Sequence, residues 1–195
     1  IIIHPFSGFW DLKHERRGNL YSASILLLLV ILTYIFMSQY TGFIINQTHP
    51  NKINVLIEVI SILVTFFLWC SVNWALTTFL EGKGTFKDIY IATAYALTPL
   101  FLLNIPTTII SNMITLEAAD IYHMLIGLAI IWSIILIYVG NMITHEFSGI
   151  KTIFASGVTI VGMLFVLFIG FLFFSVVNQV IVFTSNLYKE LVLRV

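Results

Sequence analysis

The sequence predicts an all-α protein, a polytopic membrane helical bundle of five transmembrane helices with an N-terminal interfacial helix. Composition is the first reason, because 59% of the 195 residues are hydrophobic and 9% are charged, against about a quarter charged in soluble domains. A chain of this length cannot bury so much apolar surface inside one core. The second reason is that the apolar residues form five long runs, without the period-two alternation of a membrane barrel.

The five runs approach or exceed the ~20 apolar residues that a helix needs to cross a bilayer core of about 30 Å. They have to be helical, because lipid offers no hydrogen-bond partner to exposed backbone groups. The predicted spans are Leu20–Ile45, Val55–Leu80, Ile89–Met113, Ile121–Ile143 and Ile153–Phe183. We therefore expect a cytoplasmic interfacial helix in residues 1–19 and a five-span transmembrane domain in residues 20–195.

An aromatic stripe that ends in basic residues precedes the first span. At helical spacing along one face lie Phe6, Phe9, Trp10 and Lys13, and the segment closes with Arg16 and Arg17. Aromatic rings at headgroup depth beside basic side chains are typical of a helix that lies in the membrane interface. The alternative is a solvated tail, which would leave three large aromatic side chains in water.

Two spans have features that predict irregular geometry. The third span contains Pro99 and Pro106, each of which lacks a backbone donor, so this span is predicted to be kinked or broken. The fifth span is longer than a bilayer requires. It is therefore expected to tilt, to bend near Gly162 or Gly170, or to project beyond the membrane.

The basic residues favour one orientation across the membrane. With the N-terminus inside, six of the nine basic residues lie on the cytoplasmic side: Lys13, Arg16, Arg17, Lys83, Lys87 and Lys151. Three lie outside: Lys52, Lys189 and Arg194. The positive-inside rule therefore predicts a cytoplasmic N-terminus and a C-terminus outside.

The connector FLEGKGTFKDIY, residues 79–90, has the glycines and lysine of a phosphate-binding loop but not their pattern. A Walker loop needs Ser or Thr after its Gly-Lys pair, and here Gly84 follows Lys83. A strand should also precede that loop, whereas a predicted membrane helix does. The alternative is a tight hairpin, in which Gly82 and Gly84 take positive φ. Thr85 and Asp88 are spaced like a capping box that starts the next helix.

Several short motifs surround this connector. They are Trp74-x-x-Thr77, Gly82-Lys83-Gly84-Thr85-Phe86-Lys87-Asp88 and Tyr95-Ala96-Leu97-Thr98-Pro99, with Pro5-Phe6-x-Gly8-Phe9 before them and His145-Glu146-Phe147-Ser148-Gly149 after. Together they resemble the Yip-domain family of Ypt/Rab-interacting, five-span membrane proteins. The N-terminal motif is more similar to the bacterial branch of that family.

The resemblance implies a non-catalytic membrane subunit or scaffold in a bacterial plasma membrane, bound to a larger membrane assembly. The partner that the bacterial branch suggests is a carbohydrate-uptake ABC transporter, through its permeases. The residues expected to make the contact are Phe9, Trp10, Lys13, Arg16 and Arg17 in the interfacial helix, and Gly82, Gly84, Phe86 and Lys87 in the hairpin. The hairpin and the interfacial helix are predicted on the same side of the membrane and form one docking surface in this hypothesis.

The sequence offers little for catalysis. His145-Glu146 lacks the second histidine of a zinc-protease helix, because Gly149 stands in its place. Cys70 is the single cysteine, and Glu58 lies too shallow in the second span for a proton path at the midplane. We therefore expect no enzyme, no cofactor, no metal and no small-molecule substrate, and the zero net charge argues against nucleic acid.

Two alternatives to a partner-binding subunit stay open. The two prolines of the third span are compatible with an autonomous small-solute transporter that uses a broken helix. A membrane-shaping protein of the Yip type, which acts by wedge-like insertion of its helices, is the other alternative. Partner co-purification, substrate flux in liposomes and liposome deformation would mark the three possibilities.

Overall fold

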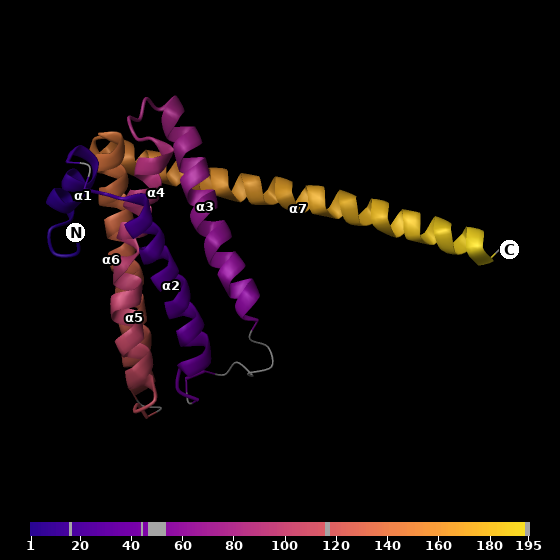
Figure 1. The fold of residues 1–195 in the computed structure, drawn as a ribbon, viewed down its shortest axis with the longest axis horizontal. Coiled ribbons are helices and arrows are strands. Elements are labelled where there is room, and N and C mark those ends of the chain that lie inside the picture. Colours follow the sequence, from indigo (N-terminus) through magenta and orange to yellow (C-terminus); the bar gives the residue numbers. More distant parts are fainter. Residues whose placement is uncertain (16, 44, 47–53, 116–117, 194–195) are drawn as a thin grey trace.

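The computed structural model describes residues 1–15, 17–43, 45–46, 54–115 and 118–193. These residues form helices joined by turns, and no strand occurs among them. The helices are α1 (Pro5–His14), α2 (Leu20–Tyr40), α3 (Val55–Phe79), α4 (Phe86–Ala96), α5 (Thr98–Ser111), α6 (Ala119–His145) and α7 (Gly149–Leu193). The two ends of the chain lie on opposite sides of the molecule, the C-terminal end at the tip of α7 (Figure 1).

Five stretches within the described residues are long and apolar enough to cross a membrane. They are Leu20–Tyr40, Val55–Phe79, Phe86–Ser111, Ala119–His145 and Gly149–Glu190. The predicted all-α fold with five spans is therefore confirmed. The first span ends earlier than the predicted Ile45, because Thr41 takes an extended backbone and the Gly42 amide donates to Ser111 Oγ at 2.9 Å.

The third span is divided into α4 and α5 at Leu97, as Pro99 predicted. A residue at position 99 of an unbroken helix would donate its amide to the carbonyl of Tyr95, and proline has no amide proton to donate. The hydroxyl of Thr98 donates to that carbonyl instead, at 2.5 Å. The second proline, Pro106, lies inside α5 without interrupting it. The break therefore comes from the first proline only.

Helices α2, α3 and α6 and the α4–α5 pair run side by side and form a bundle (Figure 1). One part of the core lies between α2, α3 and α4: Ala23, Leu27, Ile31, Phe66, Cys70, Ile89, Ile91 and Ala94. Another joins α2, α5 and α6: Val30, Leu100 and Ala129. Many of the remaining side chains point outward and are large and apolar, as expected of helices that face lipid.

Helix α1 packs against α4 and α6 at one end of the bundle. Its Phe9 side chain is 2% exposed and clusters with Ala92, Leu136 and other residues of these two helices. Phe6 and Trp10 remain 58% and 54% exposed. The predicted aromatic stripe is therefore divided, since Phe9 belongs to the protein core and not to an exposed interfacial face.

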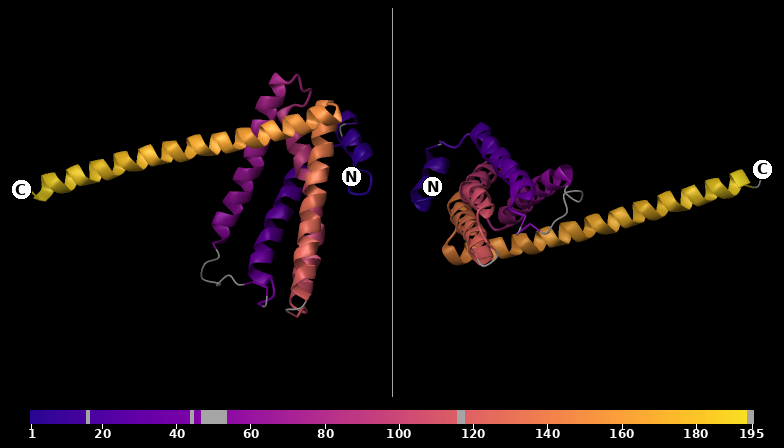
Figure 2. Two further views of the ribbon diagram at one scale, coloured as in Figure 1. Left: turned by 180° about the vertical axis from the view of Figure 1, so that it is seen from behind. Right: turned by 90° about the horizontal axis from the view of Figure 1, so that it is seen from below.

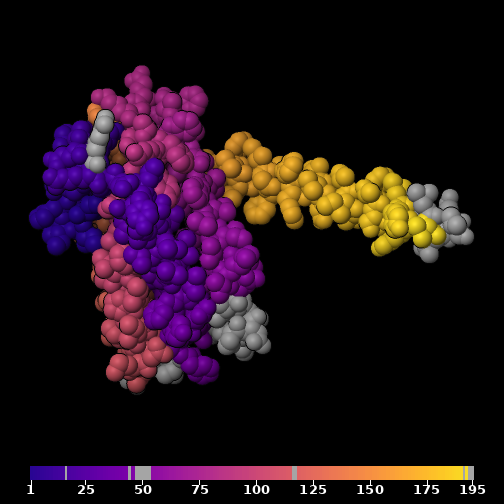
Figure 3. All heavy atoms as spheres, in the orientation of Figure 1, coloured from indigo at the N-terminus to yellow at the C-terminus, as the bar shows by residue number. Residues whose placement is uncertain are grey.

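Helix α7 begins against the bundle and then leaves it at a steep angle (Figures 1 and 2). Near its start Thr152, Ala155 and Thr159 are buried against the bundle, and α3 and α6 contact this part of the helix. Beyond Thr159 none of its described side chains is buried. The helix continues through Gly162 and Gly170 without interruption. The space-filling view shows the free length of α7 clearly (Figure 3).

Candidate interaction surface at the α1 end of the bundle

The connector between α3 and α4 is a tight hairpin, but its glycines do not act as predicted. The left-handed residue is Glu81, with φ 60°, and no described glycine has positive φ. The two positions require glycine for a different reason: the backbone of the hairpin approaches the His145 ring so closely that a side chain would not fit. A Cβ added to Gly82 would lie 2.5 Å from His145 Nδ1, and one added to Gly84 would lie 2.8 Å from His145 Cε1. The expectation of positive φ at these glycines was therefore wrong.

The start of α4 has the capping box that Thr85 and Asp88 predicted. Thr85 Oγ1 accepts from the Asp88 amide at 3.3 Å, and Asp88 Oδ2 accepts from the Thr85 amide at 3.0 Å. This arrangement fixes the first turn of the helix and directs Phe86 toward Trp74, edge to face, with 6.3 Å between ring centroids. Lys87 is exposed and makes no hydrogen bond or ion pair with the part of the chain that the structure describes.

His145 joins three segments at this end of the bundle. Its ring is 1% exposed, and its Nε2 lies 3.0 Å from Asn73 Oδ1 of α3. The ring also stacks on Phe147, with 5.3 Å between centroids, and lies against the hairpin glycines. Its Nδ1 has no hydrogen-bond partner among the described residues. Because the ring packs closely on the Gly82 backbone and contacts Asn73 and Phe147, this histidine acts as a packing element between α3, the hairpin and the end of α6.

Glu146 connects the hairpin to α1. Its backbone is left-handed, with φ 55°, and ends α6. The carboxylate accepts from Lys83 Nζ at 2.6 Å and lies 3.8 Å from His14 Nε2. The hydrogen bond from Lys83 is the main reason that the pKa of Glu146 is lowered. Since these groups are partly exposed, the network contributes more to position than to stability.

Lys13 makes a second connection between α1 and the end of α6. Its ammonium group donates to the carbonyl of Thr144. Partial burial lowers the pKa of Lys13, and the charges of Asp88 and Glu146 act in the opposite direction. A lysine stem that lies on the bundle with its head on a helix carbonyl satisfies one of the orphan acceptors at a helix C-terminus.

The structure thus brings most of the predicted contact residues to one end of the bundle. Exposed or partly exposed there are Trp10, Lys13, Arg17, Gly82, Gly84, Phe86 and Lys87. The guanidinium group of Arg17 forms ion pairs within its own segment, with the carboxylates of Glu15 at 2.7 Å and Asp11 at 3.9 Å. Phe9 is buried within its own chain, and Arg16 lies outside the described residues. We call the exposed set Trp10, Phe86 and Lys87 the α1-end surface.

Among the described residues near the two ends of the bundle, Lys and Arg gather at the α1 end. The α1 end carries Lys13, Arg17, Lys83, Lys87 and Lys151, the last with its ammonium 4.4 Å from the Phe147 ring centroid. At the opposite end, the described connector residues 41–43, 45–46, 54, 112–115 and 118 contain no Lys or Arg. No group of three His, Cys, Asp or Glu side chains that could hold a metal occurs among the described residues.

His145 and Glu146 could be recognised from the sequence as a pair at the end of a helix, but the residues that they contact could not be predicted. Asn73 makes an interhelical hydrogen bond, as expected of an asparagine inside an apolar span, but its partner could not be named from the sequence. The sequence feature that could have indicated the His145 contact is the glycine pair Gly82 and Gly84, because glycine often stands where another group approaches the backbone closely. Which group approaches is decided by residues more than 60 positions away in the chain.

A known family model covers most of the chain. The Yip1 domain model matches residues 1–179. This chain belongs to the Yip1 domain family. The matched region of the Yip1 domain includes α1, the hairpin, the end of α6 and most of α7. No curated protein and no solved structure shows significant similarity to the chain.

Proposed function

We propose that this Yip1 domain protein is a non-catalytic membrane subunit or scaffold that binds another membrane assembly through its α1-end surface. The observation that supports the proposal best is the connection of α1 to the hairpin through Glu146, which accepts from Lys83 and lies beside His14. This connection, together with the Lys13 hydrogen bond to Thr144, holds two segments that are far apart in the chain next to each other. A preorganised surface loses less conformational entropy when a partner binds.

The exposed side chains of this surface suit a protein partner. Trp10 is 54% exposed and stacks on His14, with 3.8 Å between ring centroids. Phe86 is 37% exposed, and Lys87 extends from the first turn of α4. Aromatic side chains are enriched at protein interfaces, while a lysine at the rim contributes to partner selection and association rate.

The proposed setting is a bacterial plasma membrane with the α1 end in the cytoplasm and the C-terminus outside. The lysine and arginine side chains of the α1 end support this orientation. The proposed partner is a carbohydrate-uptake ABC transporter, contacted through its permease subunits. That choice rests on the association of the bacterial branch of the family with such transporters and not on a contact in this chain.

Co-purification tests the proposal. The tagged protein is extracted from its native membrane in mild detergent, and the accompanying chains are identified by mass spectrometry. We expect stoichiometric membrane subunits with the wild type and their loss with Phe86→Ala/Lys87→Ala. The matched control is Phe43→Ala/Met113→Ala, two side chains that are 94% and 85% exposed at the opposite end. A wild type that purifies alone, or a partner retained by the first variant, contradicts the proposal.

Membrane shaping is a second candidate function, favoured by the direction of α7. From Ile160 to Phe174 the helix has no polar side chain, and α7 crosses the bundle direction steeply (Figure 2). A long apolar helix that lies across the other spans would displace lipid unequally between the two leaflets. Reconstitution of the protein alone into liposomes, with vesicle diameters measured by cryo-electron microscopy, tests this candidate. Unchanged diameters at high protein density would exclude it.

A further inference from the structure

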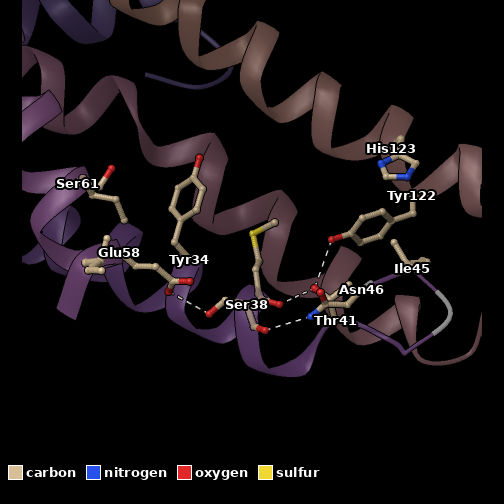
Figure 4. Close-up of a pocket in the computed structure, with 12 residues that line it drawn as sticks. Tyr34, Ser38, Thr41, Ile45, Asn46, Glu58, Ser61, Tyr122 and His123 are labelled. Carbon is tan, nitrogen blue, oxygen red and sulfur yellow. Dashed lines mark hydrogen bonds between the residues drawn. The ribbon is translucent and has the colours of Figure 1, made fainter. Parts of the chain in front are cut away.

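An open cavity of about 560 Å³ lies between α2, α3 and α6, at the end of the bundle opposite α1. Its volume is within the ~300–1,000 Å³ that is usual for small-molecule sites. The polar side chains that line it include Tyr34, Ser38, Glu58, Ser61, Tyr122 and His123 (Figure 4). None of these residues contributes to the α1-end surface, so the cavity is independent of the proposed function.

Glu58 is the acidic side chain that lines this cavity. It lies in the first turn of α3 and is half-buried. Ser38 Oγ donates toward Glu58 Oε2 at 3.0 Å and toward the Ile35 carbonyl at 2.9 Å. A serine hydroxyl has a single proton and can satisfy one of these acceptors at a time. Among the described residues, the hydrogen-bond donor to Glu58 is therefore a hydroxyl that it shares with a backbone carbonyl.

No basic counter-charge faces Glu58 from the described lining. The lining residues contain no Lys or Arg, and His123 is the single side chain among them that can become positive. The described lining thus offers the carboxylate no lysine or arginine partner, which suits a cationic ligand.

Neutral polar groups and aromatic rings complete the cavity. The hydroxyls of Tyr34 and Ser61 line it and make no hydrogen bond with the described part of the chain. The ring of Tyr122 lies on the other side, and its hydroxyl is 3.4 Å from Thr41 Oγ1 (Figure 4). A carboxylate with tyrosine rings nearby is a combination that recognises an alkylammonium group, through charge and through cation–π attraction.

We propose that this cavity binds a ligand that carries an ammonium group, with Glu58 as its counter-charge. Two sources can supply that group. One is the ethanolamine headgroup of a phospholipid, because Glu58 in the first turn of a membrane span lies at headgroup depth. The other is a soluble primary amine that enters through the open face. A metal cation fits less well, since the described residues hold no cluster of three ligating side chains.

Lipid and amine binding to the full chain test the proposal. The protein is purified into nanodiscs of phosphatidylglycerol, and unfolding temperature is measured as phosphatidylethanolamine or free ethanolamine is added. Native mass spectrometry of the detergent-solubilised protein counts retained phosphatidylethanolamine. We expect Glu58→Gln to weaken binding about 10- to 100-fold, the effect of losing a hydrogen bond to a charged group.

Control variants separate the site from general effects of charge. Glu81→Gln removes an exposed acid at the other end of the bundle and should bind as the wild type does. Tyr34→Phe keeps the charge and the packing and should weaken binding moderately, which serves as a second variant if Glu58→Gln folds poorly. Stabilisation by the lipid alone supports the headgroup as the source, and stabilisation by ethanolamine supports a soluble amine. Equal binding by wild type and Glu58→Gln, or binding of neither ligand by the wild type, overturns the proposal.

Discussion

Gly82 lies so close to His145 that a single methyl group would not fit between them. A Cβ at Gly82 would be 2.5 Å from Nδ1 of the histidine and 3.1 Å from Phe147. The backbone of the hairpin therefore packs directly on the imidazole ring, which in turn contacts Asn73 of α3. This contact links the α3–α4 hairpin to the end of α6.

Replacing Gly82 with alanine should therefore destabilise the protein. Overpacking of a tight contact costs about 1–3 kcal/mol, because the ring or the hairpin has to shift. The measurement is thermal unfolding in detergent, with Gly157→Ala as control. Gly157 has no neighbour within 4 Å and is helical, so alanine there should be neutral or slightly stabilising. Equal unfolding temperatures for the two variants would show that the contact is not tight.

Phe9 should contribute much more to stability than Phe6, although both belong to the same aromatic stripe. Phe9 is 2% exposed and Phe6 is 58% exposed. Removing a buried phenylalanine side chain costs about 3–5 kcal/mol, whereas surface substitutions usually stay within ~0.5 kcal/mol. Denaturation of Phe9→Ala and Phe6→Ala, compared with the wild type, measures the difference. Similar losses for both variants would mean that α1 is not docked through Phe9.

The link between Glu146 and Lys83 should depend on pH. The pKa of Glu146 is lowered from 4.5 in the folded protein, mainly by the Lys83 hydrogen bond. The unfolded chain therefore binds the proton more strongly, and the stabilisation is present above pH 4.5 and is lost as pH falls through the lowered pKa. We expect the wild type to exceed Glu146→Gln in unfolding temperature at neutral pH, with the difference closing in acid.

Two controls accompany that pH measurement: a substitution of Lys83, the other member of the ion pair, and a change of salt concentration. Lys83→Gln should reproduce the Glu146→Gln result, since either variant removes the same ion pair. High salt should reduce the difference, because the pair is exposed and screened. A difference that persists in acid and in high salt would contradict a stabilisation by the charge of Glu146.

Orientation across the membrane can be measured with single cysteines. In a Cys70→Ala background, Lys87→Cys at the α1 end and Asp120→Cys at the opposite end are treated with a membrane-impermeant maleimide. With the N-terminus inside, intact cells should label position 120 but not position 87, and inverted vesicles should give the reverse result. Labelling of position 87 in intact cells would invert the proposed topology.

Local features of the chain could be predicted from sequence because their causes lie within a few residues. The five spans follow from long apolar runs, and the break at Leu97 follows from the missing amide of Pro99. The capping box of Thr85 and Asp88 likewise depends on two side chains three residues apart. In each case the interacting groups are neighbours in the chain, so their spacing alone determines the geometry.

The tertiary structure decided which of the expected contact residues are free. Phe9 fits the interfacial pattern as well as Trp10 does, yet it is buried because Gly140 of α6 leaves room for its ring. The role of Gly82 depends on a histidine at the end of α6, and the environment of Glu58 depends on α2 and α6. The direction of α7 likewise appears only once the bundle is formed. These features arise from groups far apart in sequence, whose meeting depends on how the helices pack and not on any local spacing.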